Sequence, residues 1–393
     1  MKENLVSELC KSFPTPMYVF EEKKLAERVS YIKSRFGGIK ICYAVKANPF
    51  IVKLLSSSVS RFEVCSGGEY HICNESGIDI EKLVISGVYK TPSVIEEIFA
   101  RDGDMPIFTA ESARQAELIE NLAEKYGKRV RLILRLSSGN QFGLSENDII
   151  DIIRKKADSK LFEMLGLQYY SGTQKASLKR LKREITAIDD FLTRIYDETG
   201  FTAIELEFGP GFPVMYFSEE SFDEDNYISE LCNMLDSMKN RTEITIELGR
   251  ALAASCGSYL TKVVDTKSCR NENYAIVDGG MHQLVYFGQS MAMRKPFLQV
   301  LPQKEEESES IWNICGSLCS ANDILVKQLP IKGLSVGDIM VFQNTGAYCM
   351  TEGISLFLSR ELPTVLIIGA NGTASESRKQ YETYKLNMSD KIC

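Results

Sequence analysis

Lys46 is the residue whose position most directly suggests covalent chemistry. It follows the short apolar run Ile41–Val45, which is typical of a buried strand, and Pro49 then stops the pattern. A lysine directed into a cleft is costly unless it is paired, neutralised or covalently used. Buried lysines form Schiff bases with pyridoxal phosphate (PLP) or with carbonyl substrates. A lysine at a strand end can equally extend to solvent, so the segment alone leaves both interpretations open.

Glycine-rich loops and one arginine form a second group of residues with chemical potential. Gly209-Pro210-Gly211 and Gly249-Arg250 each follow an apolar run. Backbone N–H groups of such loops can cradle a phosphate, and a guanidinium adds a forked cation. A single loop of this kind is a weak signal, because most are plain turns. Several of them in one register with Lys46 predict an anion site beside the lysine.

The elements that would position these residues are eight β-type runs that alternate with helical patterns. The clearest helix carries apolar residues from Leu178 to Ile195 at spacings of three and four, and Gly200 ends it. This alternation predicts an α/β fold, a (β/α)₈ barrel, with a doubly wound open sheet as the competing layout. In a barrel, Lys46 and the glycine loops would share the carboxyl ends of the strands, where chemistry takes place. The runs are Ile41–Val45, Arg61–Cys65, Leu83–Ser86, Pro106–Thr109, Val130–Leu136, Leu165–Tyr170, Ile204–Phe208 and Ile244–Glu247.

After residue 250 the pattern changes to short β-type runs separated by Gly, Asp and Asn turns. Because helical periodicity is weak here, we expect a mostly antiparallel β domain. Residues 303–310, rich in Lys, Glu and Ser, are predicted to form a solvated loop. We expect a barrel over residues 25–252 and a β domain from residues 1–24 and 253–393. The β-type runs are Ser258–Val264, Tyr274–Val277, Ile311–Ile314 and Ile339–Gln343.

Composition narrows the class of protein. The 393 residues are 44% hydrophobic and 25% charged, as in ordinary globular proteins, and this length favours two domains. A net charge of -7 without a basic run argues against nucleic-acid binding. No apolar stretch is long enough to span a bilayer, and Met1–Asn4 does not open a secretory signal. Eleven scattered cysteines and only two histidines argue against a metal site and predict reduced thiols in the cytoplasm.

Eight short segments occur in one order along the chain: Tyr43–Asn48, Phe62–Glu69, Gln141–Gly143, Gly209–Phe212, Glu247–Arg250, Asp278–Met281, Cys315–Cys319 and Gly346–Tyr348. Together they resemble the PLP-dependent decarboxylases of the alanine-racemase-type barrel, the family of diaminopimelate, ornithine and arginine decarboxylases. The resemblance extends from Tyr18 to about Pro363. Within the family, Tyr170–Gln174 and Asp278–His282 are most similar to a branch that decarboxylates carrier-protein-bound glutamate in antibiotic biosynthesis.

The resemblance implies a PLP-dependent amino-acid decarboxylase and assigns the cofactor contacts. Lys46 would bind PLP as a Schiff base. Glu247 would hydrogen-bond the pyridine nitrogen and keep it protonated, so that the ring accepts the electrons left when CO₂ departs. Without the resemblance, Glu247 could close a surface ion pair and Tyr348 could be a packed core residue. The phosphate would be held by Thr173, Gly211, Gly249, Arg250 and Tyr348, while Arg135 and Glu69 would orient the cofactor.

Cys319 is the group that the resemblance assigns to reprotonation of the substrate α-carbon. In the family this cysteine comes from the second domain of the partner subunit, so a homodimer with shared active sites is implied. Tyr348 and Asp323 would lie at the same interface, and Ser320 and Asp323 would face the substrate. A lone cysteine would otherwise be a small buried hydrophobe.

Two departures from the family pattern lie at the cofactor end. The sixth-strand motif of the family usually carries histidines, the second of which stacks on the PLP ring. Gln168 and Tyr170 occupy these positions here. Tyr170 can still stack through its aromatic face. Pro210 replaces the middle glycine of a triplet and has no N–H, so one phosphate donor would be missing.

Two further departures lie at the substrate end. Diaminopimelate decarboxylases carry Arg-Pro shortly after Asp-Gly-Gly-Met, whereas Leu284–Phe287 follow here. The residue after the acid cysteine is normally Asp or Glu, but here it is Ser320. Both charged groups for the distal end of a substrate are therefore absent. We expect an amino acid of specialised metabolism with an uncharged, bulky, amide-linked or thioester-linked distal end, free or presented by a carrier protein, and not diaminopimelate or ornithine.

Two other functions fit parts of the pattern. A racemase on the same barrel needs two opposed bases and no CO₂ loss, and Cys315–Asp323 favours the decarboxylase. A catalytically silent PLP-binding regulatory homologue would act through a partner. The joint presence of Lys46, Glu247, Arg250 and Cys319 argues against the silent homologue.

Overall fold

The computed structural model describes residues 1–102, 104–156 and 159–389, and the chain divides into two compact units. The first, the barrel unit, comprises residues 29–213 and 222–251. The second, the β unit, comprises residues 1–28, 214–221 and 252–393. Among the described residues, no helix combines the length and apolar character that crossing a membrane would require.

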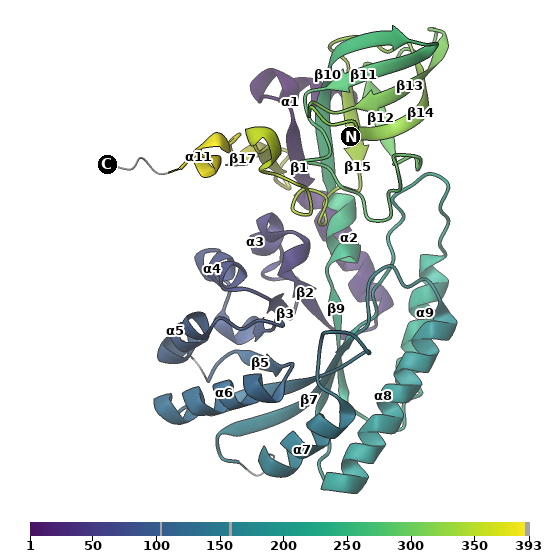
Figure 1. Ribbon diagram of the computed structural model, residues 1–393. Coiled ribbons are helices and arrows are strands. Elements are labelled where there is room, and N and C mark those ends of the chain that lie inside the picture. The colour runs from purple at the N-terminus through teal and green to yellow at the C-terminus, as the bar shows by residue number, and fades with distance from the viewer. Residues whose placement is uncertain (103, 157–158, 390–393) are drawn as a thin grey trace. The chain divides into compact units, whose positions relative to one another are not determined.

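The barrel unit is built on eight parallel strands that close into a barrel in the order β2 to β9 (Figure 1). The predicted α/β barrel is therefore confirmed, and the open sheet is excluded by the pairing of β2 with β9. The strands are β2 (Lys40–Ala44), β3 (Arg61–Val64), β4 (Leu83–Ile85), β5 (Ile107–Ala110), β6 (Val130–Leu136), β7 (Phe162–Tyr170), β8 (Glu205–Gly209) and β9 (Glu243–Leu248).

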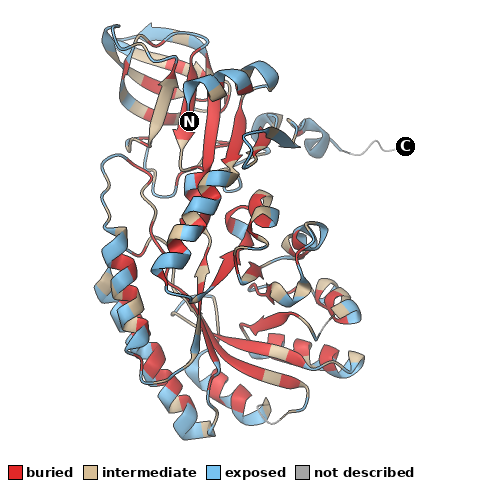
Figure 2. Cartoon of the chain, turned by 180° about the vertical axis from the view of Figure 1, so that it is seen from behind, coloured by how far each residue is buried: buried red, intermediate tan, exposed pale blue. Residues whose placement is uncertain are grey.

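Capping residues set the ends of the helices. Helix α8 begins after Ser177, whose hydroxyl accepts from the Arg180 N–H, and ends at the left-handed Gly200 as predicted. Its apolar face is buried and its polar face exposed, as Figure 2 shows. The helices are α1 (Glu3–Ser12), α2 (Glu22–Arg35), α3 (Val52–Leu55), α4 (Gly67–Glu75), α5 (Pro92–Asp102), α6 (Ala113–Tyr126), α7 (Glu146–Lys156), α8 (Leu178–Thr199), α9 (Glu224–Asp236), α10 (Arg250–Ala253) and α11 (Tyr384–Asn387), with short 3₁₀ turns η1 (Val45–Ala47), η2 (Pro49–Ile51), η3 (Ile80–Lys82), η4 (Ala254–Cys256) and η5 (Phe357–Ser359).

The barrel strands bury both apolar and charged side chains. An apolar cluster joins five strands through Cys42, Val84, Ile107, Ile133 and Leu165. Strands β3, β6, β7, β8 and β9 also contribute polar groups, which alternate along each strand with apolar residues. These buried polar residues include Arg135, Gln168, Glu63, Glu205, Glu207 and Thr245. Charges inside a barrel need partners, and their arrangement shapes the site described below.

The β unit contains a nine-stranded sheet in which most neighbours are antiparallel, as predicted. The pairs β1·β16 and β11·β13 are parallel. The predicted loop over residues 303–310 is wrong at its end, because β13 already begins at Glu309, where it pairs with Lys332. The strands are β1 (Met17–Glu21), β10 (Gly257–Cys269), β11 (Glu272–Val277), β12 (Leu298–Leu301), β13 (Glu309–Cys315), β14 (Ile324–Lys332), β15 (Ile339–Gln343), β16 (Thr364–Ile368) and β17 (Ala374–Arg378).

Candidate active site

The predicted cofactor residues of the barrel unit gather at the carboxyl ends of three strands. Lys46 follows β2. Tyr170 is the last residue of β7, and Thr173 lies just after it. Glu247 and Arg250 lie at the end of β9. Burial raises the pKa of the Tyr170 hydroxyl, and the charges of Lys46, Glu247 and Arg250 all act on that hydroxyl. The Arg250 Nε also donates to Thr173 Oγ1 at 3.2 Å. The structure therefore brings these five residues into one cluster.

Lys46 lies in η1 and forms an ion pair with a buried carboxylate. Its Nζ is 2.6 Å from Glu63 Oε2 and 3.6 Å from Cys65 Sγ. Burial would raise the pKa of the Glu63 carboxyl, but the Lys46 ammonium group brings that pKa below its ordinary value. The amine is thus held in place at the mouth of the barrel. Glu63 was missed in the sequence, although a charged residue between two apolar ones in a buried strand is a usable signal.

Glu247 is directed into the barrel toward other carboxyl groups. Its Oε1 accepts from Gln168 Nε2 at 2.5 Å, and the same amide nitrogen donates to Glu207 Oε1 at 3.1 Å. Burial, the Glu63 charge and the Glu207 carboxyl raise the pKa of Glu247 well above its ordinary value. A carboxyl group in this setting favours a cationic neighbour, because such a neighbour would stabilise its charged form.

Arg250, Thr173 and Gly211 offer groups suited to an anion. Arg250 is 6% exposed, and a buried guanidinium favours bidentate contacts with phosphate or carboxylate. Gly211 has φ of +62°, and a Cβ there would lie 2.0 Å from the Gly172 carbonyl oxygen. Only glycine fits this close approach. Pro210 lies in the same loop and donates no hydrogen bond.

Tyr170 and Gly249 frame this cluster. A Cβ on Gly209 would meet Tyr170 Cδ2 at 2.5 Å and Glu247 Oε2 at 3.1 Å, so the ring and the carboxyl group both lie against that glycine. Gly249 connects β9 to α10 and lies next to Arg250. The aromatic face of Tyr170 is thereby fixed at the end of β7, near the Glu247 carboxyl group.

Arg135 and Glu69 both have well-defined partners in the protein. Arg135 Nη1 is 3.0 Å from Glu111 Oε1, both side chains are buried, and the guanidinium lies over the Phe142 ring. The Glu69 carboxylate accepts from the Cys65 N–H at 2.7 Å, while the Ser66 hydroxyl caps helix α4 by accepting from the Glu69 N–H. These contacts give Glu69 a structural role, and Glu111 fixes the position of the Arg135 guanidinium.

Asp323 organises the predicted substrate loop of the β unit. Its two oxygens accept from the N–H groups of Met281 and Leu318, each at 2.7 Å, and the residue is 2% exposed. Side chains on Gly280 or Gly316 would clash with this carboxylate. Asp323 therefore joins the segments Asp278–Met281 and Cys315–Cys319, and its contacts are those of a positioning group.

Cys319, Ser320 and Tyr348 differ in how they are held. The Cys319 side chain is exposed in the chain, whereas the Ser320 hydroxyl is partly covered and accepts from the Asn322 N–H at 3.3 Å. Tyr348 has φ of +65°, a costly conformation for a bulky residue, and its carbonyl accepts from the Thr351 N–H at 2.8 Å. Such backbone strain often accompanies a functional position.

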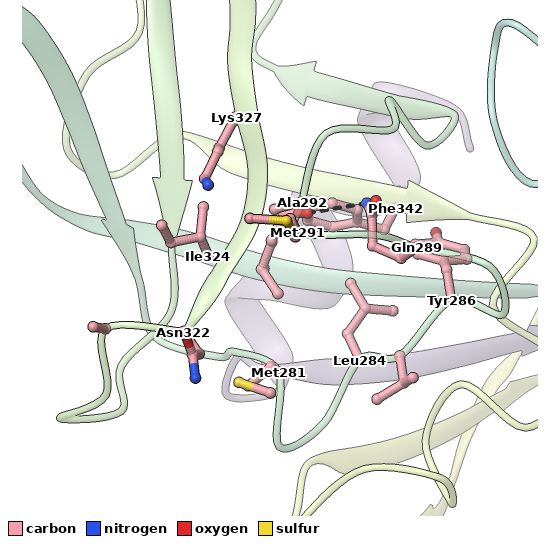
Figure 3. Close-up of a pocket in the computed structure, with 13 residues that line it drawn as sticks. Met281, Leu284, Tyr286, Gln289, Met291, Ala292, Asn322, Ile324, Lys327 and Phe342 are labelled. Carbon is pink, nitrogen blue, oxygen red and sulfur yellow. Dashed lines mark hydrogen bonds between the residues drawn. The ribbon is translucent and has the colours of Figure 1, made fainter.

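Residues 316–323, between β13 and β14, form a loop that we call the Cys319 loop. An apolar cavity of about 400 Å³ lies beside this loop within the β unit (Figure 3). Leu284, Val285 and Tyr286 contribute one side of its lining, and Ala321 and Asn322 of the Cys319 loop contribute another. Figure 3 shows Leu284 and Lys327 extending toward the cavity from different segments. Lys327 is the one charged residue among the thirteen described residues that line it.

The chain is similar to known proteins in both sequence and fold. A family model described as "Pyridoxal-dependent decarboxylase, pyridoxal binding domain" matches residues 22–254. L-glutamyl-[BtrI acyl-carrier protein] decarboxylase of Niallia circulans is 28% identical over 407 residues, covering 95% of this chain and 93% of the relative. Diaminopimelate decarboxylase of Aquifex aeolicus is 24% identical over 396 residues, covering 96% and 92%. The crystal structure of diaminopimelate decarboxylase from Helicobacter pylori complexed with L-lysine superposes with a TM-score of 0.85 at 24% identity, covering 97% of this chain and 98% of that chain.

Proposed function

The chain belongs to the family of pyridoxal-dependent decarboxylases, and from this premise we propose that its substrate is an amino acid whose distal end is uncharged or thioester-linked. It is a carboxy-lyase that acts on an amino acid, and its cofactor is PLP. The observation that carries the proposed substrate class is the cavity beside the Cys319 loop, which Leu284, Val285 and Tyr286 line with apolar and aromatic side chains.

The residues of the barrel mouth fit PLP. Lys46 offers an amine fixed against Glu63, and Glu247 offers a buried carboxyl group that would be stabilised by a cationic ring nitrogen. Arg250 offers a buried guanidinium for the phosphate. When bound, PLP supplies an electron sink for the carbanion that CO₂ loss would leave.

We propose a role toward the cofactor for each residue at the barrel mouth. Lys46 would hold the cofactor covalently through Nζ, and the Tyr170 ring would lie along the face of the cofactor. Arg135, fixed by Glu111, would orient the cofactor from β6. The phosphate would contact Thr173, Gly211, Gly249, Arg250 and Tyr348.

The substrate end would be completed by a second subunit. We assign reprotonation of the α-carbon to Cys319, whose exposed side chain is free to face a partner's barrel. Exposed apolar residues at positions 354–358 and 381–388 offer a surface for such a homodimer. These two segments are joined by a hydrogen bond from Asn387 Nδ2 to the Leu356 carbonyl, at 2.7 Å.

The cavity supports a substrate whose distal end continues into a neutral chain. The described residues of the lining include one cation, Lys327, and no carboxylate, so the lining would not stabilise the distal ammonium of diaminopimelate or ornithine, because a buried unpaired charge is costly. The Asn322 side-chain amide lines the cavity and can hydrogen-bond a thioester or amide, and Ser320 lies in the same loop. The similarity to a glutamyl-carrier-protein decarboxylase favours a γ-linked glutamyl group, presented by a carrier protein in specialised metabolism. The ten free cysteines among the described residues favour a reducing cytoplasm as its location.

A one-pot competition followed by mass spectrometry tests this substrate class. Equal amounts of free L-glutamate, its γ-thioester with pantetheine, meso-diaminopimelate and L-ornithine would be offered to the PLP-loaded enzyme. We expect the thioester to be decarboxylated fastest and to leave its decarboxylated thioester as product. Turnover of diaminopimelate or ornithine at rates matching the thioester would contradict the proposal. The Lys46→Ala variant serves as the blank for uncatalysed loss of CO₂.

A further inference from the structure

Four glutamates line one side of the barrel, facing fewer cations than their charges would need. Lys46 pairs with Glu63. Arg61 forms a two-pronged pair with Glu205, through Nη1 to Oε1 and through Nη2 to Oε2 at 2.9 Å. Arg61 Nη1 also lies 3.6 Å from Glu207 Oε2, so one guanidinium is shared between two carboxyl groups, and two cations face four glutamates.

Gln168 joins the two remaining carboxyl groups. The strand register places it beside Glu207, and its Nε2 donates to Glu207 Oε1 at 3.1 Å and to Glu247 Oε1 at 2.5 Å. A hydrogen bond also joins the two carboxyl groups. It acts to raise the pKa of Glu247 and to lower that of Glu207, so Glu247 is its donor when no cation faces Glu247. Glu207 and Gln168 are 0% and 1% exposed, so water cannot screen the repulsion between two ionised carboxylates here. A neutral amide offers hydrogen bonds but no charge to offset theirs.

From these contacts we propose that Glu207 and Glu247 share one proton, and that Glu207, held by Gln168, retains it when Glu247 is ionised toward a cationic ring nitrogen. Glu207 and Gln168 are thus positioning residues, and the inference rests on the proposed role of Glu247. Two carboxyl groups that share a buried site commonly retain one proton between them. Because glutamine does not titrate, the proton must stay on a carboxyl group.

The two oxygens of Glu207 have different surroundings. Oε2 forms no hydrogen bond among the described residues but faces Arg61 Nη1 at 3.6 Å, which favours negative charge on that oxygen. Oε1 lies beside Gln168 Nε2, which also contacts Glu247, so a proton on Glu207 would be placed on this side. Burial raises the pKa of Glu207 to about 7, while Arg61, 3.6 Å away, acts in the opposite direction.

Other charged groups around the pair do not remove the need for a proton. The negative charges of Glu205 and Glu63 also act on Glu207 and raise its pKa further. The buried Cys42 thiol lies among the same carboxyl groups, and its own pKa is raised well above the ordinary value by burial. Arg135, the neighbour of Gln168 on β6, is paired with Glu111.

Infrared spectroscopy on protein labelled with ¹³C at the glutamate side-chain carboxyl groups tests the proposal. At neutral pH the PLP-loaded protein should show an isotope-shifted band of a protonated glutamyl carboxyl group, and Glu207→Gln should remove it. Glu184→Gln should retain the band, because Glu184 is buried but holds its carboxylate charge against Lys175 and Arg180. A wild-type protein without the band, or a Glu207→Gln variant that keeps it, would overturn the proposal.

A second readout separates positioning from folding. Glu207→Gln mimics a protonated carboxyl group, so the pH dependence of the visible absorbance of bound PLP should match that of the wild type. Gln168→Leu removes both hydrogen bonds and should shift the apparent pKa of that absorbance by at least about one unit, the size expected for loss of a charged hydrogen bond. An unshifted titration in folded Gln168→Leu would contradict the positioning role. If PLP does not bind at all, the infrared band of the cofactor-free protein still tests proton sharing, so the two failures are distinguishable.

Discussion

The barrel mouth and the Cys319 loop differ in whether their candidate catalytic side chains are held by partners within the same unit. At the barrel mouth, Lys46, Glu247 and Arg250 are fixed by Glu63, Gln168 and Thr173. In the β unit, Asp323 fixes the backbone of the loop, but the Cys319 side chain is exposed beside an apolar cavity. This difference supports the proposal that the first region holds the cofactor and the second contributes to substrate choice.

The largest effect should come from Lys46. Lys46→Ala removes the amine proposed to hold PLP, so the visible absorbance of the bound cofactor should disappear and decarboxylation should fall by more than about a thousandfold. Lys53→Ala, at an exposed lysine of α3, should change neither measurement. A variant without Lys46 that keeps the absorbance band would place the covalent link elsewhere.

Cys319 should affect turnover without affecting cofactor binding. Cys319→Ala removes the proposed acid, and loss of a general acid typically lowers the rate by about 10²-fold or more. PLP absorbance should remain unchanged, because the cysteine belongs to the other region. Cys269→Ala, which also removes an exposed thiol of the β unit, should keep full activity. Equal effects of the two substitutions would refute a specific role for Cys319.

Gly211 should sharpen the account of the cofactor end. In Gly211→Ala the new methyl group meets the Gly172 carbonyl oxygen, so the phosphate loop must shift and PLP affinity should fall by about tenfold, or about 1.4 kcal/mol. Gly77→Ala is the matched control, since Gly77 has φ of +73° but open space around its Cα. Equilibrium dialysis of both variants separates the clash from backbone strain. Similar PLP affinities would show that the close approach does not matter.

Leu284 should alter substrate choice at the other region. Leu284→Arg introduces a cation into the apolar cavity and should favour substrates with a free distal carboxylate by several-fold, in line with the modest energies of single contacts. The ratio of kcat/KM values for free glutamate and its γ-thioester measures this change. Val336→Arg, at an exposed position of the β unit outside the proposed dimer surface, should leave the ratio as in the wild type. No change in Leu284→Arg would remove the cavity from the substrate site.

The smallest effect concerns the pH dependence of stability. Glutamate in the unfolded chain has a pKa of about 4.3, whereas burial raises the pKa of Glu207 in the fold to about 7. The folded cofactor-free protein therefore binds more protons between these values, and its free energy of unfolding should fall as pH rises through this window. Urea unfolding should show a shallower fall for Glu207→Gln. A wild-type free energy of unfolding that rises across the window would contradict the buried proton.

The sequence predicted the barrel better than the β unit for a physical reason. Buried parallel strands are continuous apolar runs, so β2 to β9 stand out between helical patterns. Strand β14 contains Pro330 and several exposed residues, and β17 (Ala374–Arg378) is largely exposed. Neither strand therefore has a clear apolar pattern. Strand β1 lies far from its partners in sequence, and β10 and β16 pair with it only in the fold.

The site was partly predictable for a similar reason. Lys46, Glu247 and Arg250 lie next to strand ends and glycines that mark them as functional. Glu63, Glu111 and Glu207 were missed as site residues, because their importance depends on partners from other strands. Asp323 was predicted to face substrate, yet its carboxylate is bound by two backbone N–H groups that only the folded loop brings together.

A subunit-mixing experiment tests most directly whether the two regions act together across a homodimer. Lys46→Ala and Cys319→Ala, each nearly inactive alone, would be mixed under conditions that exchange subunits. Random exchange in a two-fold dimer gives one intact site per mixed dimer, so we predict recovery to about a quarter of wild-type activity. A mixture that stays as inactive as the separate variants, although mass spectrometry detects mixed dimers, would contradict the account.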